Sequence, residues 1–285
     1  MTKQYRSLRA QWLGKRLQKL RVAAGLTLPA AATAIDRDPT SVSRWENGAS
    51  PIRSELLLHL LDLYGIKKRA ERTEFLGLCD EVASHGWWDA YSKYLEPEFT
   101  DLLWIEENCT GMQQVEMVMM PGLLQSEAYA EALIRNDPDL SDDLQIRRLT
   151  ELRMARQELH EQPHPPQVSV ILYEAAVRQH VGGKQVMREQ MLQLVETSAM
   201  KHVVIRLLPL ESWAHAGTEA SSGFTIFQMP APYPQVGYAE SSAGRAYLEE
   251  EQMPRIRSLY DRLAAEAMEP DATAKRMKAL AKEYS

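Results

Sequence analysis

The segment between residues 26 and 48 constrains the fold more than any other part of this 285-residue chain. Thr27 suits the position before a helix, because its side chain can accept a hydrogen bond from a first-turn amide. Pro29 suits the first turn itself, where the amide that proline lacks would have no partner. Asp38 and Pro39 repeat the same signal further along the chain. The segment therefore predicts two short helices joined by a tight polar turn.

The second of these helices turns a hydrophobic side inward. Val42 and Trp45 are three residues apart and share one face of a helix, and Gly48 is a typical helix terminator. The outward side keeps short polar side chains and one guanidinium group, from Thr40, Ser41, Ser43, Arg44 and Asn47. Such a surface fits the major groove of DNA, where arginine can bind guanine and hydroxyl groups can bind phosphates or base edges. The two helices together form a helix-turn-helix pattern.

A solvated helical hairpin is the alternative interpretation, because one such pattern is a weak signal in a helical protein. The flanking segments favour DNA binding. A basic helix is expected over residues 13–21 and a leucine-rich helix over 53–64. Four or five helices in this order form a compact head of the kind that binds DNA.

The charge of the chain is divided between its two ends. The whole sequence has a formal charge of −6, but residues 1–65 hold ten Lys and Arg against five Asp and Glu. This gives +5 on the head and leaves −11 on residues 66–285. A basic head on an acidic body is expected when only one end meets phosphate groups. An ordinary surface charge is the alternative, since +5 is modest.

Composition narrows the remaining classes of protein. Hydrophobic residues make up 45% of the chain, enough for a buried core, and Cys79 and Cys109 are the only cysteines. No apolar stretch approaches the length that a bilayer requires, and the N-terminus lacks an apolar signal segment. We therefore expect a soluble protein of the reducing cytoplasm, associated with the nucleoid when bound to DNA, with no membrane partner.

The rest of the sequence mixes strand and helix patterns. Strands are expected over 113–119, 168–173, 203–208, 224–229 and 236–239, with 247–248 as a short partner. Helices are expected over 99–109, after Ser126, over 142–161 with Ser141 as the cap, and over 174–180, 184–199, 252–268 and 271–282. This order predicts an α+β or mixed α/β body behind a mainly α-helical head. The expected domains are a helix-turn-helix domain at 1–66, a connecting helix and aromatic segment at 67–98, and an α+β regulatory and dimerisation domain at 99–285.

Two sets of motifs resemble known families. Residues 20–27, followed by Ser-Arg-Trp-Glu-Asn-Gly at 43–48, resemble the Xre and phage-repressor family of helix-turn-helix domains. Further motifs are similar to Xre-type regulators of filamentous actinomycetes, whose C-terminal domain has no assigned function and is described as antitoxin-like. These motifs are Gly-Trp-Trp at 86–88, Pro-Gly-Leu-Leu-Gln at 121–125, Tyr-Ala at 129–130 and Ala-His-Ala-Gly at 214–217. The resemblance implies a transcriptional regulator, often paired with a small partner protein encoded nearby.

Two positions depart from the family pattern. Asp36 stands where the family has a turn glycine, which the turn tolerates because aspartate can adopt a left-handed conformation. Leu28 replaces a polar residue and so removes an expected phosphate contact. The resemblance also implies an ion pair between Arg21 and Glu46, which ties the first helix of the head to the recognition helix.

Positions along the second helix predict two classes of DNA contact. Thr40, Ser43 and Arg44 lie in the part that enters the groove, so we expect them to contact base edges, with Arg44 binding a guanine. The DNA backbone is expected to be held by residues around them, namely Lys15, Arg16, Ser41, Asn47 and Arg53. One short helix buries too little surface for specific binding, so we expect a homodimer on paired half-sites of double-stranded operator DNA. The aromatic cluster over 87–99 is the expected dimer or interdomain surface.

No motif in the body predicts catalysis, a cofactor or a metal. The sequence lacks a phosphate-binding glycine loop, a nucleophile elbow and a cysteine pair at metal spacing. His160 and His164 are four residues apart, but Pro163 and Pro165 interrupt the helix that would align them as ligands. We therefore expect a protein that is not an enzyme and that holds no cofactor.

Two functions of different classes remain open for the body. In the first, a DNA-binding regulator uses it to dimerise and to receive a partner protein or effector. In the second, a small-molecule sensor or enzyme-like body is joined to a DNA-binding head, and His215 and Tyr247 are its candidate ligand or partner site. An ordinary loop histidine is the alternative for His215. The lack of a catalytic constellation favours the first function.

Overall fold

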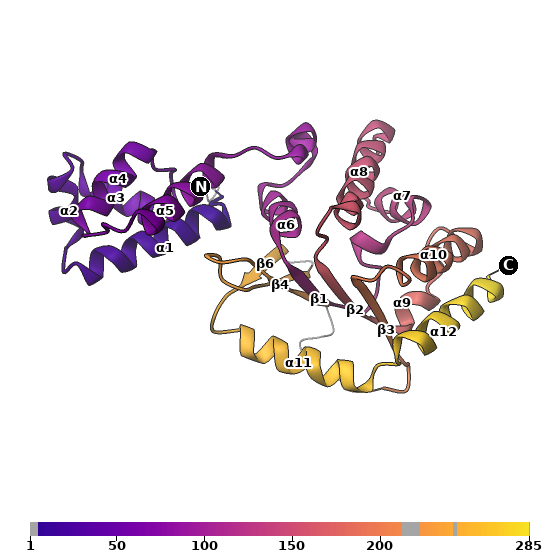
Figure 1. Cartoon of the computed structure of the whole chain (residues 1–285). Helices are drawn as coiled ribbons and strands as arrows, with labels where there is room; N and C mark the ends of the chain where they lie inside the picture. Colours follow the sequence, from indigo (N-terminus) through magenta and orange to yellow (C-terminus); the bar gives the residue numbers. More distant parts are fainter. Residues whose placement is uncertain (1–4, 213–222, 242–243, 285) are drawn as a thin grey trace. The chain divides into compact units, whose positions relative to one another are not determined.

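The computed structural model describes residues 5–212, 223–241 and 244–284. The chain forms two compact units, residues 1–104 and 105–285. The first unit is helical, and the second contains a six-stranded sheet with helices around it (Figure 1). The predicted fold class, a helical head followed by an α+β body, is confirmed.

The helix-turn-helix segment begins and ends at the residues that the sequence indicates. Thr27 accepts a hydrogen bond from the amide of Ala30 at 3.3 Å, and Asp38 accepts one from the amide of Ser41 at 3.0 Å. Gly48 has φ +62°, the left-handed conformation of a helix terminator. The helices of the first unit are α1 (Leu8–Ala23), α2 (Leu28–Ala34), α3 (Pro39–Glu46), α4 (Ser54–Leu63), α5 (Arg69–Ala83), the 3-10 helix η1 (Trp87–Tyr94) and the start of α6 (Pro97–Asn108).

The core of the first unit is built from leucine and small side chains. Leu17 of α1, Val42 of α3 and Leu57 of α4 are fully buried, and Ala31 and Ala32 of α2 let α3 approach closely. Helix α5 packs against α1 and α4, so the charged segment after α4 belongs to the same compact unit.

Gly14 lets α1 cross the end of α3 at close range. A Cβ atom at this position would lie 2.6 Å from the carbonyl oxygen of Trp45 and closer still to that of Glu46. Because both neighbours are backbone atoms, they cannot swing away as a side chain could. Any residue larger than glycine must therefore push the two helices apart.

Replacing Gly14 with alanine should lower the free energy of unfolding by about 1 to 3 kcal/mol, the usual cost of overpacking a core. Gly77 of α5 is the matched control, because a Cβ atom there meets nothing within 4 Å. Gly77→Ala should instead raise stability by about 0.5 to 1 kcal/mol, as alanine favours a helix interior. Thermal unfolding of both variants tests this, and a Gly14→Ala protein as stable as Gly77→Ala would contradict the close crossing.

The sheet of the second unit has the order β3-β2-β1-β4-β5-β6. Strands β1, β2 and β3 run parallel, and β4, β5 and β6 continue the sheet antiparallel. Gln114 of β1 lies opposite Thr225 of β4, which lies opposite Tyr238 of β5. The strands are β1 (Gly111–Glu116), β2 (Gln167–Tyr173), β3 (Val203–Leu208), β4 (Phe224–Gln228), β5 (Val236–Ser241) and β6 (Gly244–Leu248).

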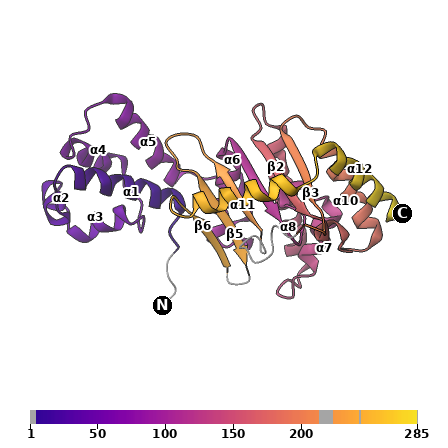
Figure 2. The ribbon, with the colours of Figure 1, turned by 90° about the horizontal axis from the view of Figure 1, so that it is seen from below.

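Helices cover both faces of this sheet. Helix α11 (Met253–Glu266) lies across one face, where Ile256 and Leu263 pack against Val115, Ile171 and Ile226 (Figure 2). The other face carries α6, α8 and α10 in Figure 1, and α12 packs against α10 and β3. The remaining elements are η2 (Gly122–Leu124), α7 (Glu127–Arg135), α8 (Asp143–Ala155), η3 (Arg156–Glu161), α9 (Glu174–Arg178), α10 (Lys184–Thr197) and α12 (Pro270–Glu283). None of the described helices has both the length and the apolar composition needed to cross a bilayer.

The prediction for the helix over 142–161 is wrong in its cap, while the helical segment does end at Glu161. Its cap is Asp142, which accepts from the amide of Leu144 at 3.0 Å, and not Ser141. A carboxylate accepts a stronger hydrogen bond from an amide than a hydroxyl does, which favours the later cap. The α-helix ends at Ala155 and continues as the 3-10 helix η3.

His160 of η3 contacts a different histidine from the one its sequence neighbours suggest. Its Nδ1 lies 3.1 Å from Nε2 of His202, and its Nε2 lies 3.2 Å from the carbonyl oxygen of Leu123, while His164 is exposed. A carbonyl can only accept, so Nε2 of His160 carries the proton and Nδ1 accepts from His202. Burial, together with the nearby His202 ring, lowers the pKa of His160.

Stability should therefore fall in acid through His160. Because its pKa is lower in the folded than in the unfolded state, the unfolded chain binds the proton first as the pH falls below about 6.5. The loss of stability begins near this pH and is complete once the pH lies below the pKa of His160 in the folded protein. Urea unfolding at pH 7.5 and at pH 5.5 measures this loss of stability. Between the two pH values, His160→Gln should lose less stability than the wild type, and exposed His164→Gln should lose as much as the wild type. Equal losses of stability in all three proteins would show that His160 does not contribute to the loss in acid.

Candidate nucleic-acid interface

The turn between α2 and α3 is held by a left-handed aspartate. Asp36 has φ +54° and is the one described non-glycine residue with positive φ. The amide of Arg37 then donates to the carbonyl of Ala32 at 2.9 Å, which closes the turn against the end of α2. Aspartate thus adopts the left-handed conformation that the sequence predicted for this turn.

Helix α3 presents one polar face on the outside of the first unit. Thr40, Ser43, Arg44 and Asn47 follow at spacings of three and four residues, so they lie on the same side of the helix. Thr40, Arg44 and Asn47 are exposed, and Ser43 is half-buried. The candidate base-contacting residues are therefore brought together on one surface.

Three of the predicted contact residues also take part in hydrogen bonds in and around α3. Asn47 donates through Nδ2 to the carbonyl of Ser43 at 2.8 Å and to its hydroxyl oxygen at 3.2 Å. The hydroxyl of Ser41 donates to Asp38 at 2.7 Å, as part of the N-terminal cap. All four side chains are at the surface, and exposed hydrogen bonds of this kind exchange readily with other partners.

The flanking basic residues differ in how they are placed. Lys15 and Arg53 are exposed. Arg16 instead forms an ion pair with Glu74, and its guanidinium lies over the ring of Phe75 at 4.5 Å. Phe75 is buried, so Arg16 helps to hold α5 against α1. A phosphate would have to compete with Glu74 for this arginine.

Arg21 of α1 and Glu46 of α3 form a buried pair with two hydrogen bonds. Nε of Arg21 donates to Oε1 at 2.6 Å and Nη2 to Oε2 at 2.8 Å, which is the bidentate geometry of a strong ion pair. Arg21 is 8% exposed and Glu46 4%. Nη1 of Arg21 also donates to the carbonyl of Leu26 at 2.7 Å, just before α2. One guanidinium group thus fixes α1, the start of α2 and the recognition helix together.

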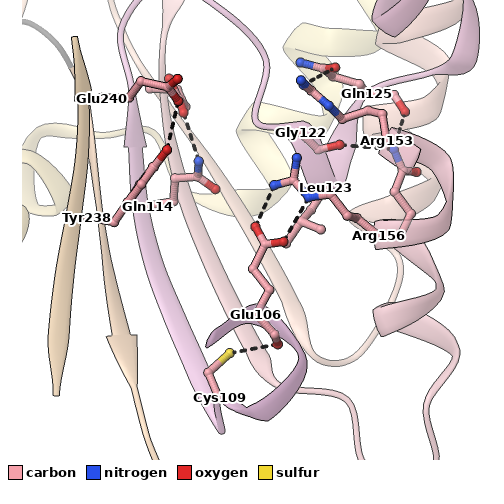
Figure 3. A network of polar contacts seen from close by, with 12 residues as sticks. Glu106, Cys109, Gln114, Gly122, Leu123, Gln125, Arg153, Arg156, Tyr238 and Glu240 are labelled. Carbon is pink, nitrogen blue, oxygen red and sulfur yellow. Dashed lines mark hydrogen bonds and ion pairs between the residues drawn. The ribbon is translucent and has the colours of Figure 1, made fainter. Parts of the chain in front are cut away.

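Of the two candidate ligand or partner residues of the body, the structure describes only Tyr247. His215 lies outside the described residues. Tyr247 is half-buried in β6, with its ring centroid 5.5 Å from that of Tyr238. In the second unit, Glu106 and Arg156 form a buried ion pair at 2.6 Å that no sequence pattern indicated (Figure 3). The two are 50 residues apart, and no local pattern connects them.

In the comparisons with known proteins, two separate regions of the chain match protein families. Residues 12–75 match the family described as a helix-turn-helix domain, and residues 99–279 match the domain of unknown function (DUF5753). The crystal structure of the clp gene regulator ClgR from C. glutamicum is 28% identical over 28% of this chain and 95% of that chain, with a TM-score of 0.22. A comparison with curated proteins gave no match.

The matched regions follow the structure. The first runs from α1 into α5 and contains the whole helix-turn-helix segment. The second begins in α6, ends in α12 and contains the entire sheet, so it spans more than half of the chain. The chain therefore belongs to the family that carries the domain of unknown function (DUF5753), joined here to an N-terminal helix-turn-helix domain.

Proposed function

We propose that this protein is a sequence-specific DNA-binding transcriptional regulator. The observation that carries the proposal is the outer face of α3, where Thr40, Ser43 and Arg44 lie together on a helix. The buried pair of Arg21 and Glu46 fixes that helix from behind. A polar face on a rigidly held helix can enter the major groove without an ordering cost. Enzymatic activity is not part of the proposal.

Within this proposal, Arg44 binds a guanine through its two-pronged guanidinium group, and Thr40 and Ser43 contact neighbouring base edges. The DNA backbone is held by the surrounding polar residues, Lys15, Ser41, Asn47 and Arg53, with a smaller share from Arg16 because Glu74 already occupies it. The protein acts as a homodimer in the cytoplasm, on the nucleoid. Residues 99–285 dimerise and receive an effector or a small partner protein encoded nearby.

Two arginine variants should lose DNA affinity in different ways. Arg44→Ala should weaken binding to the operator by about 1 to 3 kcal/mol and relax the preference for one base pair in each half-site. Arg53→Ala should weaken binding to all sequences alike and reduce the salt dependence by about one unit per site. Fluorescence anisotropy with a selected operator duplex and a scrambled duplex, over a series of salt concentrations, measures both effects.

The scrambled duplex is the control that separates base contacts from phosphate contacts. Arg37 is an exposed arginine in the turn before α3 and is not one of the predicted DNA contacts, so replacing it offers a further comparison with Arg44→Ala. Its Nη1 donates to the carbonyl oxygen of Asp36 at 2.7 Å. Equal losses on operator and scrambled duplexes for Arg44→Ala would make Arg44 a phosphate contact. The base-contacting role would then fall to Thr40 and Ser43.

A further inference from the structure

The short segment that leads into α1 is held in place by a buried carboxylate of the first unit. The hydroxyl of Tyr5 donates to Oδ2 of Asp101, and the amide of Leu8 donates to the same oxygen at 2.6 Å. Asp101 is only 1% exposed, so this anchor lies inside the unit. Arg6 lies between the two anchored residues, and its backbone is therefore fixed although it precedes the helix.

The start of α1 also lies directly against the end of α3. A Cβ atom at Gly48 would lie 2.7 Å from the amide nitrogen of Gln11 and 3.0 Å from the carbonyl oxygen of Ala10, so the two backbones are in contact there. The side-chain amide of Gln11 donates to the carbonyl oxygen of Arg6 at 2.9 Å. These contacts place Arg6 at the end of the helix that we propose enters the major groove.

The guanidinium group of Arg6 reaches the last residue of the polar face of α3. Its Nη1 donates to the carbonyl oxygen of Asn47 at 3.3 Å, and Asn47 shares that face with Ser43 and Arg44. Arg6 is exposed, and none of the described carboxylates forms an ion pair with it. Its remaining N–H groups have no partner among the described residues and are open to a ligand.

Two roles are open to a cation at this place. It can cap the last turn of α3, whose carbonyl groups carry partial negative charge. It can also bind a phosphate group, because the planar donors of arginine match phosphate oxygens. Capping occupies one N–H group and leaves the rest of an exposed guanidinium unused. The anchored backbone favours phosphate binding, since a fixed residue loses little conformational freedom when it binds.

We propose that Arg6 binds a backbone phosphate of the operator, next to the end of the recognition helix. The inference rests on the proposed DNA-binding function and extends its interface. Arg6 precedes the region that matches the helix-turn-helix family, which begins at residue 12. The segment before α1 is thus part of the DNA-binding surface of this protein.

The salt dependence of DNA binding by the full-length protein tests this contact. Arg6→Gln keeps a donor for the carbonyl of Asn47 but removes the charge. It should reduce the slope of log affinity against log salt concentration by about one unit per bound protomer, and weaken binding to operator and scrambled duplexes alike by at least about threefold. Arg6→Lys keeps the charge and should keep the slope of the wild type. Fluorescence anisotropy over a series of salt concentrations measures both variants.

Two controls separate a phosphate contact from other effects of the change. Lys278→Gln removes one positive charge from an exposed position of α12 in the second unit, and should leave the slope unchanged. Hydrogen exchange of the amides of α3 reports the fold, and Arg6→Gln should keep the protection of the wild type, because an exposed hydrogen bond contributes little stability. Lower protection of α3 in Arg6→Gln would make Arg6 a helix cap and overturn the proposal.

Failure of this contact is distinguishable from failure of the DNA-binding function. If the wild type binds both duplexes and Arg6→Gln binds them with the same slope, the phosphate contact is wrong and the DNA-binding function stands. If Arg6→Gln loses affinity for the operator alone, Arg6 contacts a base, which also overturns the proposal. If the wild type binds neither duplex, the DNA-binding function fails and this contact fails with it.

Discussion

Replacing Glu46 with alanine should destabilise the first unit by about 3 to 5 kcal/mol, because it leaves the buried guanidinium of Arg21 without its carboxylate. Arg21 donates to both oxygens of Glu46, at 2.6 and 2.8 Å, and both residues are less than 9% exposed. Hydrogen exchange of the amides of α1 and α3 measures this unit within the full chain. Protection there should fall by at least two orders of magnitude.

The control for this variant is Glu55→Ala, which removes an exposed carboxylate from α4 and should change protection little. The double variant Arg21→Met with Glu46→Leu removes both charges and should recover much of the loss, since two hydrophobic residues leave no buried charge unpaired. Unchanged protection in Glu46→Ala would show that the pair does not hold the recognition helix.

Replacing Glu106 with alanine should have a comparable effect on the second unit, again about 3 to 5 kcal/mol. The change would remove the carboxylate to which Arg156 donates two hydrogen bonds, beside a second guanidinium group, that of Arg153, over Gly122. Hydrogen exchange of amides in β1 and β2 reports the loss. The free energy of opening measured at these amides should fall, while hydrogen exchange in α1 and α3 should stay unchanged.

Glu107 is the matched control, because it is the next residue of α6 and is exposed. Glu107→Ala should lie within about 0.5 kcal/mol of the wild type, the usual range for a surface substitution. Glu106→Gln keeps one acceptor for Arg156, so the stability of its second unit should lie between those of the other two variants. If Glu106→Ala and Glu107→Ala lost the same protection, the buried pair would contribute nothing to the fold.

Features that depend on near neighbours in the sequence were predictable. Thr27, Asp38 and Ser126 cap their helices through an amide three residues later, and Gly48 ends α3 with a positive φ. Such contacts close within one helical turn, so residue type and spacing determine them. Strands of the second unit were also predictable, because β2 and β3 are mostly apolar, with Ser169 and Arg206 as polar interruptions.

Features that depend on distant partners were not predictable. Arg16 has the sequence context of a phosphate contact, but the fold brings Glu74 and Phe75 against it. Arg156 lies in a segment whose charges suggest a solvated helix face, yet it is buried against Glu106. Charge type alone does not reveal which side chains the packing of helices will enclose.

The most direct test of the DNA-binding account is selection of bound duplexes from a random library by the full-length protein, with Arg44→Ala selected in parallel. The account predicts that the wild type enriches a two-fold symmetric sequence with half-sites about one helical turn apart, each containing a guanine that Arg44→Ala no longer requires. Recovery of unselected sequences by the wild type, at an affinity that depends on salt alone, would contradict it.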